Sequence, residues 1–358
     1  MMIERTLMGL IAVCLTVVAS CGGGDGGDGK DPMLGESHIL SYASPYPPGH
    51  PFSKADQKWM DHIVTQSDGR LRFKTFWGGS LISSEMSMLE IRHGVADIGL
   101  ITPIYTKGGA HLLQTQAGFF GGVKSIEDQV AVFYCLLNSS PQFNRELDGL
   151  KVLAVQGGNF PGVLTKDRII SSLDDFRGLR LRVQSEAVDV IKALGADPVT
   201  MPMGEVYSAL AKGIIDGVVA PADTIHSLHF SEVANHFTTL RFSRGAYPAR
   251  AMSEKRWLQL PVDLQALIVN AHSVWESALS DELKRAEERG IAFGAAEGIT
   301  FHTIPATEQA RFDQLYNALA LDQAQELATL NIDAEPIFHL AQQLILTDTV
   351  DHCGSAGQ

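Results

Sequence analysis

The alternation of apolar and polar residues is clearest in residues 178–221. Every second residue from Leu179 to Val183 is apolar, which is the period of a strand with one apolar face. Ser185 is then placed as a helix N-cap and Gly195 as a helix end. The pattern continues as a helix at 186–194, a strand at 198–203, a helix at 205–212 and a strand at 214–219. This alternation predicts one lobe of an α/β protein.

The rest of the chain alternates in the same way. We expect strands at 39–44, 70–77, 98–102 and 151–156, and helices at 53–67, 85–94 and 125–137. Residues 261–290 have an apolar stripe and a charged opposite face, which predicts one long helix. Helices are also expected at 306–330 and 334–346. The chain should leave the first lobe after the strand at 151–156 and return near Tyr247–Met252.

The first 21 residues read as an export signal. Arg5 precedes an apolar run at 7–18, which is too short to span a bilayer and fits a signal peptide. The small residues before Cys21 resemble a lipobox, which predicts cleavage there and acylation of the Cys21 thiol; an ordinary secretory cleavage site is the alternative. Residues 22–36 are rich in Gly and Asp and predict a flexible tether. Residues 349–358 form a polar tail.

Composition narrows the function classes. The 358-residue chain has a formal net charge of −13 and no basic cluster, which argues against nucleic-acid binding. After the signal and tether, its length suffices for two lobes of ordinary domain size. Cys135 lies in an apolar helical pattern and Cys353 in the polar tail. We expect both thiols to be unpaired, although the compartment would permit a disulfide.

Arg182 is the candidate for binding chemistry. It lies near the carboxyl end of a predicted strand that leads into a helix, where ligands of α/β proteins gather. A guanidinium there can hold a carboxylate through two parallel hydrogen bonds. The alternative is a surface arginine that pairs with a nearby acid such as Glu186.

The sequence has no motif that supports metal binding, dinucleotide binding or catalysis. His226, His229 and His236 fall close together, but a zinc site needs three or four converging ligands and the HExxH motif is absent. The segment GGNFPG lacks dinucleotide-binding spacing. No nucleophile elbow, P-loop or paired-carboxylate signature is present. We therefore expect no enzyme activity, no cofactor and no metal.

Several ordered motifs resemble one family. The segments are FRGLRLRVQ from Phe176, LGADPVTMPMGEVYSAL from Leu194, KGIIDGVVAP from Lys212, GGSLISSEMSMLEIRHGVADIGL from Gly78 and RWLQLPVDLQALIVNA from Arg256. They are similar to the extracytoplasmic solute receptors of TRAP transporters (DctP-type periplasmic proteins). The resemblance implies a two-lobed periplasmic-binding-protein fold with a hinge and a long helix spanning both lobes. Lobe I would comprise 37–157 and 250–287, and lobe II with the C-terminal helices 158–249 and 288–348.

The resemblance also implies a binding site. Arg182 matches the arginine that holds the solute carboxylate in most members, and Ser185 matches a polar contact three residues on. The other implied or candidate positions are Met203, which covers the ligand, Thr102 and Tyr105 on the first lobe, and Tyr46 and His50 in the loop after the first strand. Ala220 stands where many members have a solute-contacting asparagine.

The positions at which this sequence departs from the family's binding motifs, such as Ala220, indicate the class of solute. Gly162 lies where sialic-acid receptors have a second arginine, and the Glu-Trp pair of metal-assisted keto-acid receptors is absent. An apolar wall beside one arginine suits a monocarboxylate with a hydrophobic or aromatic body. The resemblance implies a periplasmic, membrane-anchored lipoprotein that closes its lobes around the solute and delivers it to TRAP permease membrane subunits. A receptor that feeds a sensor kinase or an ABC importer is the alternative.

Overall fold

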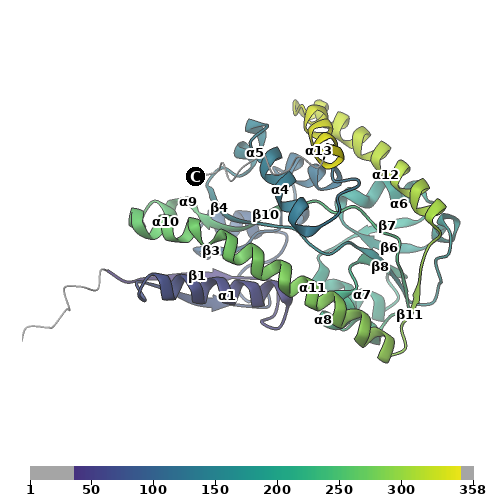
Figure 1. The fold of residues 1–358 in the computed structure, drawn as a ribbon, viewed down its shortest axis with the longest axis horizontal. Helices are drawn as coiled ribbons and strands as arrows, with labels where there is room; N and C mark the ends of the chain where they lie inside the picture. The colour runs from purple at the N-terminus through teal and green to yellow at the C-terminus, as the bar shows by residue number, and fades with distance from the viewer. Residues whose placement is uncertain (1–35, 348–358) are drawn as a thin grey trace, which may run out of the picture. The chain divides into compact units, whose positions relative to one another are not determined.

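The computed structural model describes residues 36–347, and Figure 1 shows its two β-sheets with their helices. The first sheet has the order β2-β1-β3-β10-β4. Its strands are β1 (His38–Ala43), β2 (Leu71–Phe76), β3 (Ile98–Leu100), β4 (Leu150–Gln156) and β10 (Tyr247–Ser253). β1 runs parallel to β2 and β3, whereas β10 is antiparallel to both β3 and β4. β10 joins this sheet after the chain has passed through the other lobe.

The second sheet has the order β11-β9-β5-β8-β6-β7. Its strands are β5 (Gly162–Thr165), β6 (Arg180–Val183), β7 (Asp197–Thr200), β8 (Gly217–Ala220), β9 (His236–Thr238) and β11 (Thr300–His302). β6 is parallel to β7 and β8, and β5 is antiparallel to β8 and β9. The chain crosses between the sheets after β4 and again before β10. The predicted two-lobed α/β fold is confirmed.

The long helix expected at 261–290 is divided. It forms α10 (Val262–Asn270) and α11 (His272–Ala296), with Ala271 between them. α11 packs against α1 (Pro51–Gln66) and β4 in the first lobe, and against α8 (Asp223–Ser227) and β11 in the second. Figure 1 shows α11 in green beside both sets of elements. A single helix therefore contacts both lobes, as expected, although it starts later and ends later.

Shorter helices cover the two sheets. In the first lobe they are α2 (Ser87–Arg92), α3 (His111–Thr115), α4 (Ile126–Leu137), α5 (Pro141–Glu146) and α9 (Glu254–Trp257). In the second lobe they are α6 (Val188–Ala193) and α7 (Val206–Ala211). The sequence explains the start of α4, because the Ser125 side chain accepts a hydrogen bond from the backbone N–H of Asp128.

The two C-terminal helices add to both lobes. α12 (Ala306–Glu326) contacts α6 of the second lobe and α3 of the first, and α13 (Glu335–Thr347) packs against α4. Their apolar residues extend two separate cores: Phe312 joins the core around β6, and Phe338 joins the core around α4. The C-terminal helices thus bridge the two lobes on a second side.

Two local predictions are wrong. Ser185 is not a helix N-cap: it begins a 3-10 turn, Ser185–Ala187, and α6 starts only afterwards. Cys135 is not an unpaired thiol, because it is disulfide-bonded. Its apolar helical setting concealed this, since a buried cysteine and a bridged one have the same sequence pattern. The chain's other cysteines, including Cys353, lie outside the described residues.

The N-terminal predictions also lie outside the described residues. These are the signal peptide, the lipobox at Cys21 and the Gly/Asp-rich tether. Within residues 36–347, none of the helices combines the length and the apolar character needed to cross a membrane.

Candidate functional site

Arg182 is fully buried in the second lobe. It lies on β6 beside Val199 of β7 and Val218 of β8, and its exposed fraction is 0%. Its Nε donates to the carbonyl of Met201 at 3.1 Å, and its Nη2 donates to the phenolic oxygen of Tyr105 at 2.7 Å. Its Nη1 is buried and has no hydrogen-bond partner. Buried polar atoms nearly always have partners, so this donor marks an unfilled position.

The alternative of a surface arginine paired with Glu186 is wrong. Arg182 is not on the surface, and none of the ion pairs within residues 36–347 includes it. An arginine buried without a carboxylate is rare, because a desolvated charge is normally paired. Arg182 therefore has a buried donor, Nη1, without a partner, and no carboxylate of the described residues forms an ion pair with it.

Two contacts join the lobes at this point. Tyr105 ends the 3-10 turn Pro103–Tyr105 that follows β3, so its bond to Arg182 crosses from the first lobe to the second. The Ser185 hydroxyl donates to the carbonyl of Ile104 at 3.2 Å, which is a second crossing. The guanidinium also lies 5.8 Å from the Tyr105 ring centroid. The predicted residues Arg182, Ser185 and Tyr105 therefore come together.

Tyr46 lies at the same place. Burial raises the pKa of its phenol well above the ordinary value, Tyr105 and Tyr247 raise it further, and the charges of Arg182 and Arg244 oppose this. All four of these groups act on the Tyr46 phenol, and Tyr105 and Tyr247 belong to one apolar cluster. We call this set, Tyr46, Tyr105, Arg182, Arg244 and Tyr247, the tyrosine–arginine cluster.

Sequence reasoning missed Arg244 and Tyr247. Both lie where the chain returns to the first sheet, and Arg244 rests on the outgoing crossing: a Cβ added to Gly158 would stand 2.4 Å from its Cζ. Tyr247 begins β10, and its hydroxyl accepts from Gln156 at 2.8 Å. The available signal was the return crossing, expected at 247–252, because a charged residue, Arg244, stands just before it.

At two other predicted positions, Thr102 and His50, the polar side-chain atoms already bind other parts of the first lobe. The Thr102 hydroxyl bonds to the carbonyl of Ser84 and lies 3.1 Å from the Ser87 hydroxyl, inside the first lobe. His50 caps α1, because its Nδ1 accepts from the N–H of Phe52. Burial, with smaller effects of Arg250 and Lys54, lowers the pKa of His50 to about 3, so this side chain is neutral.

Met203 and Ala220 supply apolar surface in the second lobe. Both are buried in one cluster with Val218, the strand neighbour of Arg182. Ala220 pairs with Gly162 across β8 and β5, and a Cβ added at Gly162 would meet the Phe237 ring at 2.6 Å. Gly162 is therefore required by packing in this chain, whatever stands there in other receptors. Whether Met203 and Ala220 touch the solute stays a prediction.

Carboxyl groups surround Arg244. Glu186, Asp223 and Glu287 all have pKa values raised by burial, and the charge of Arg244 opposes that rise in each. Glu287, on α11, has its pKa raised to about 7 by burial and by neighbouring Asp223. The Asp223 N–H donates to the Glu287 carboxyl at 3.1 Å. This region therefore holds protonatable acids next to an arginine.

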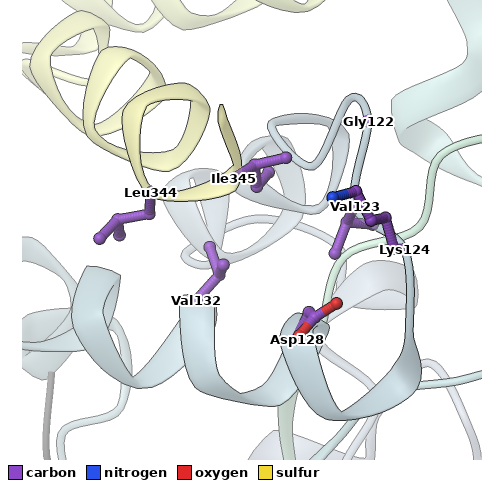
Figure 2. A pocket seen from close by; sticks show the side chains of 7 residues that line it. All are labelled: Gly122, Val123, Lys124, Asp128, Val132, Leu344 and Ile345. Atoms are coloured by element: carbon purple, nitrogen blue, oxygen red, sulfur yellow. The ribbon is translucent and has the colours of Figure 1, made fainter. Parts of the chain in front are cut away.

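Two pockets lie elsewhere on the molecule. Figure 2 shows one of about 10 Å³ between α4 and α13, which is room for about one water. It is lined by Gly122, Val123, Lys124, Asp128, Val132, Leu344 and Ile345. The other, of about 500 Å³, is an open groove between the end of α6 and α12. Neither includes a residue of the tyrosine–arginine cluster.

The three clustered histidines of the sequence do not converge. His236 lies 3.3 Å from the ring of His302, His229 lies 3.4 Å from the Glu232 carboxyl, and His226 packs against Phe293. Within the described part of the chain, no three His, Cys, Asp or Glu side chains are arranged to hold a metal ion.

Comparison with known proteins gives relatives over most of the chain. The chain is 27% identical over 309 residues to the C4-dicarboxylate-binding periplasmic protein DctP of Rhodobacter capsulatus, covering 85% of this chain and 91% of that protein. The profile of bacterial extracellular solute-binding protein family 7, DctP, matches residues 42–326.

Solved structures share the fold. A TRAP solute binding protein from Rhodoferax ferrireducens T118 in complex with copurified benzoate has a TM-score of 0.79 at 23% identity, over 87% of this chain and 99% of that one. A marine metagenome TRAP solute binding protein specific for aromatic acid ligands, in complex with metahydroxyphenylacetate, has a TM-score of 0.78 at 23% identity, over 86% and 98%. The profile match covers far more than half of the sequence, and the chain belongs to the DctP family of extracytoplasmic solute receptors of TRAP transporters.

Proposed function

We propose that this receptor binds an organic acid through Arg182, and that the acid is a monocarboxylate with an aromatic or other apolar body. One observation carries the proposal: a fully buried guanidinium has an Nη1 donor without a partner and forms no ion pair among the described residues. A solute carboxylate would supply both the missing acceptor and the missing charge. Binding in a buried position makes this bond stronger than it would be in water.

The surroundings of Arg182 support an apolar body. Ala220 and Met203 are buried with Val218, the strand neighbour of Arg182, and contribute no hydrogen-bonding side chain. Tyr105 brings an aromatic ring to the guanidinium from the first lobe. Aromatic rings pack well on such surfaces, with gains beyond the area buried. The two solved relatives that bound benzoate and metahydroxyphenylacetate have the same fold, which is consistent with this solute class.

Capture would occur by closure of the two lobes. Arg182 and Ser185 belong to the second lobe, whereas Tyr105 and Ile104 belong to the first, and they meet directly. A solute that contacts both sides stabilises the closed form relative to the open form, which shifts the population toward closure. No covalent step is involved.

The proposal is tested by calorimetric titration of the purified chain with benzoate, using Arg182→Met and Arg180→Met. Arg180 is the matched control, because it lies on the same strand but is 45% exposed and pairs with Asp216. Arg182→Met should weaken benzoate binding at least about tenfold, since a charged hydrogen bond contributes roughly 1.5–3 kcal/mol. Arg180→Met should leave it unchanged. Equal affinities of the wild type and Arg182→Met would refute the role of Arg182.

We further propose that the closed receptor delivers its solute to TRAP permease membrane subunits and that the chain is a periplasmic lipoprotein anchored through Cys21. Family membership supports the compartment, and the lipobox-like sequence supports the anchor. Metabolic labelling with a fatty acid should mark the wild type but not Cys21→Ser. Uptake of labelled benzoate by cells should require both this chain and the permease subunits; uptake without them would point to another transporter.

A further inference from the structure

Cys135 has a disulfide partner that lies outside the described residues. Its side chain is 7% exposed on α4, and it is the one cysteine between residues 36 and 347. The rest of the sequence contains three more, Cys14, Cys21 and Cys353. One of these three supplies the second sulfur atom of the bond.

Two of the three cysteines are committed to other chemistry. Cys14 lies in the predicted signal peptide, which cleavage before Cys21 would remove. Acylation would convert the Cys21 thiol to a thioether, whereas a disulfide forms only through a thiolate. The exclusion of Cys21 therefore rests on the proposed lipid anchor. Cys353 is the cysteine that remains.

The end of α13 lies close enough to Cys135 for Cys353 to reach it. Val132 and Leu344 line the same small pocket between α4 and α13 (Figure 2). Cys135 follows Val132 by three residues, and Thr347 follows Leu344 by three residues, so each lies about 4.5 Å further along its helix. The six residues from Thr347 to Cys353 can span up to about 20 Å. This reach suffices whichever way the two helices run.

Cys135 also faces the core that α13 completes. It shares one apolar cluster with Val132 and Leu136 of α4 and with Phe338 and Leu344 of α13. The Cα atoms of a disulfide usually lie about 4.4–6.8 Å apart, so the second cysteine must come close to this surface. The segment that follows α13 starts beside it.

We propose that Cys135 is bridged to Cys353, which fastens the segment after α13 to α4. Each of the two thiols gives up one proton and one electron when the S–S bond forms. A disulfide-containing oxidant in the periplasm accepts both protons and both electrons by thiol–disulfide exchange and leaves as a dithiol.

The bond closes a loop that contains both crossings between the lobes and the whole second sheet. Restricting so long a loop in the unfolded chain favours the folded state. Both helices near the bond belong to the core of the first lobe, so opening and closing of the lobes does not require breaking it.

The bond is tested by peptide mapping of the full chain, purified from the cell envelope without reductant and alkylated before unfolding. Trypsin releases Cys135 in residues 125–145 and Cys353 in residues 312–358, because no Lys or Arg follows Arg311. These two peptides should be found linked to each other, and they should separate when the sample is reduced.

Melting temperatures test the same bond independently. Cys353→Ser should lower the melting temperature by about 4–16 °C without reductant and should change it little with reductant. In a Cys135→Ser background, Cys353→Ser should have no further effect, because the bond is already absent. Ser355→Ala is the matched control in the same segment and should melt like the wild type.

The outcomes separate this inference from the proposed function. If the peptide with Cys135 is linked to one that carries Cys14 or Cys21, both this inference and the proposed anchor are wrong. If Cys135 is alkylated as a free thiol, or is linked to the same peptide of a second copy, only the present inference falls. If it is linked to Cys353 but Cys21 carries no lipid, the inference stands and the anchor falls. If Cys353→Ser melts like the wild type without reductant, the inference is wrong.

Discussion

Asp56 anchors the buried polar network of the first lobe, and its removal should be unusually costly. Its Oδ1 accepts from Arg250 Nε at 2.6 Å and from Trp275 Nε1 at 2.7 Å, and its Oδ2 accepts from Tyr42. Asp56 and Arg250 are both 0% exposed. The network ties α1 to β10 and α11. Asp56→Ala therefore leaves a buried guanidinium without its partner charge.

The magnitude follows from burial. Breaking a buried ion pair by removing one partner costs about 3–5 kcal/mol, and the orphaned donors of Trp275 and Tyr42 raise the total to roughly 4–6 kcal/mol. That is a large part of a typical stability of about 5–15 kcal/mol. Melting should fall by about 10–20 °C, at roughly 2–4 °C per kcal/mol. Asp56→Asn, which keeps the shape but removes the charge, should lie between the wild type and Asp56→Ala.

Asp263→Ala is the matched control, because its ion pair with Arg70 has an almost equal length of 2.5 Å but side chains 26% and 59% exposed. An exposed pair contributes little to stability, because water and salt screen its charges. The assay is urea unfolding of all three variants, with the midpoint and slope compared with those of the wild type. If Asp56→Ala lost no more than Asp263→Ala, the reasoning from burial would be refuted.

Three further predictions concern the lobe junction and the disulfide. Burial and Asp223 raise the folded pKa of Glu287 to about 7. Between about pH 4.5 and 7 the folded state therefore binds more protons than the unfolded state, and the free energy of unfolding should fall by about 1–3 kcal/mol as the pH rises through this range. Glu287→Gln should flatten that pH dependence in melting curves. Gly290→Ala places a Cβ 2.1 Å from the carbonyl of Ala222 and should cost about 1–3 kcal/mol, whereas Gly204→Ala, which meets nothing within 4 Å, should be nearly neutral in urea unfolding. Cys135→Ser removes a disulfide and should cost about 2–4 kcal/mol, and a wild-type melt unchanged by reductant would contradict this.

The sequence predicted most of the regular structure, because periodicity reports which residues face a core. The strand at 151–156 and the helix at 125–137 agree with β4 and α4 within one residue. The prediction from sequence failed where a tertiary contact overrides the local conformational preference of a residue. Ser185 has the chemistry of an N-cap, but its hydroxyl bonds across the lobe boundary to Ile104, and the backbone there forms a 3-10 turn.

Sequence reasoning predicted only the site residues that lie next to strands within the family motifs. Arg182 lies near the end of β6 and Tyr105 ends the 3-10 turn that follows β3, and the resemblance to a family pointed to both. Arg244 lies in a segment without periodicity, and its partner surface is the backbone of Gly158, 86 residues earlier. No local pattern encodes such a pairing, because it depends on how two crossings pack side by side.

The two contacts across the lobe boundary bear on how a solute is selected. Tyr105 accepts from Arg182 Nη2, while Nη1 stays without a partner, so a carboxylate can bind Nη1 without breaking the Tyr105 bond. In the proposed mechanism, closure and solute binding would then stabilise each other at the same guanidinium. A solute stabilises the closed form only by its differential interaction with the two forms. An acid that reached Arg182 but not the first lobe would bind without shifting that population, and it would occupy the receptor without closing it.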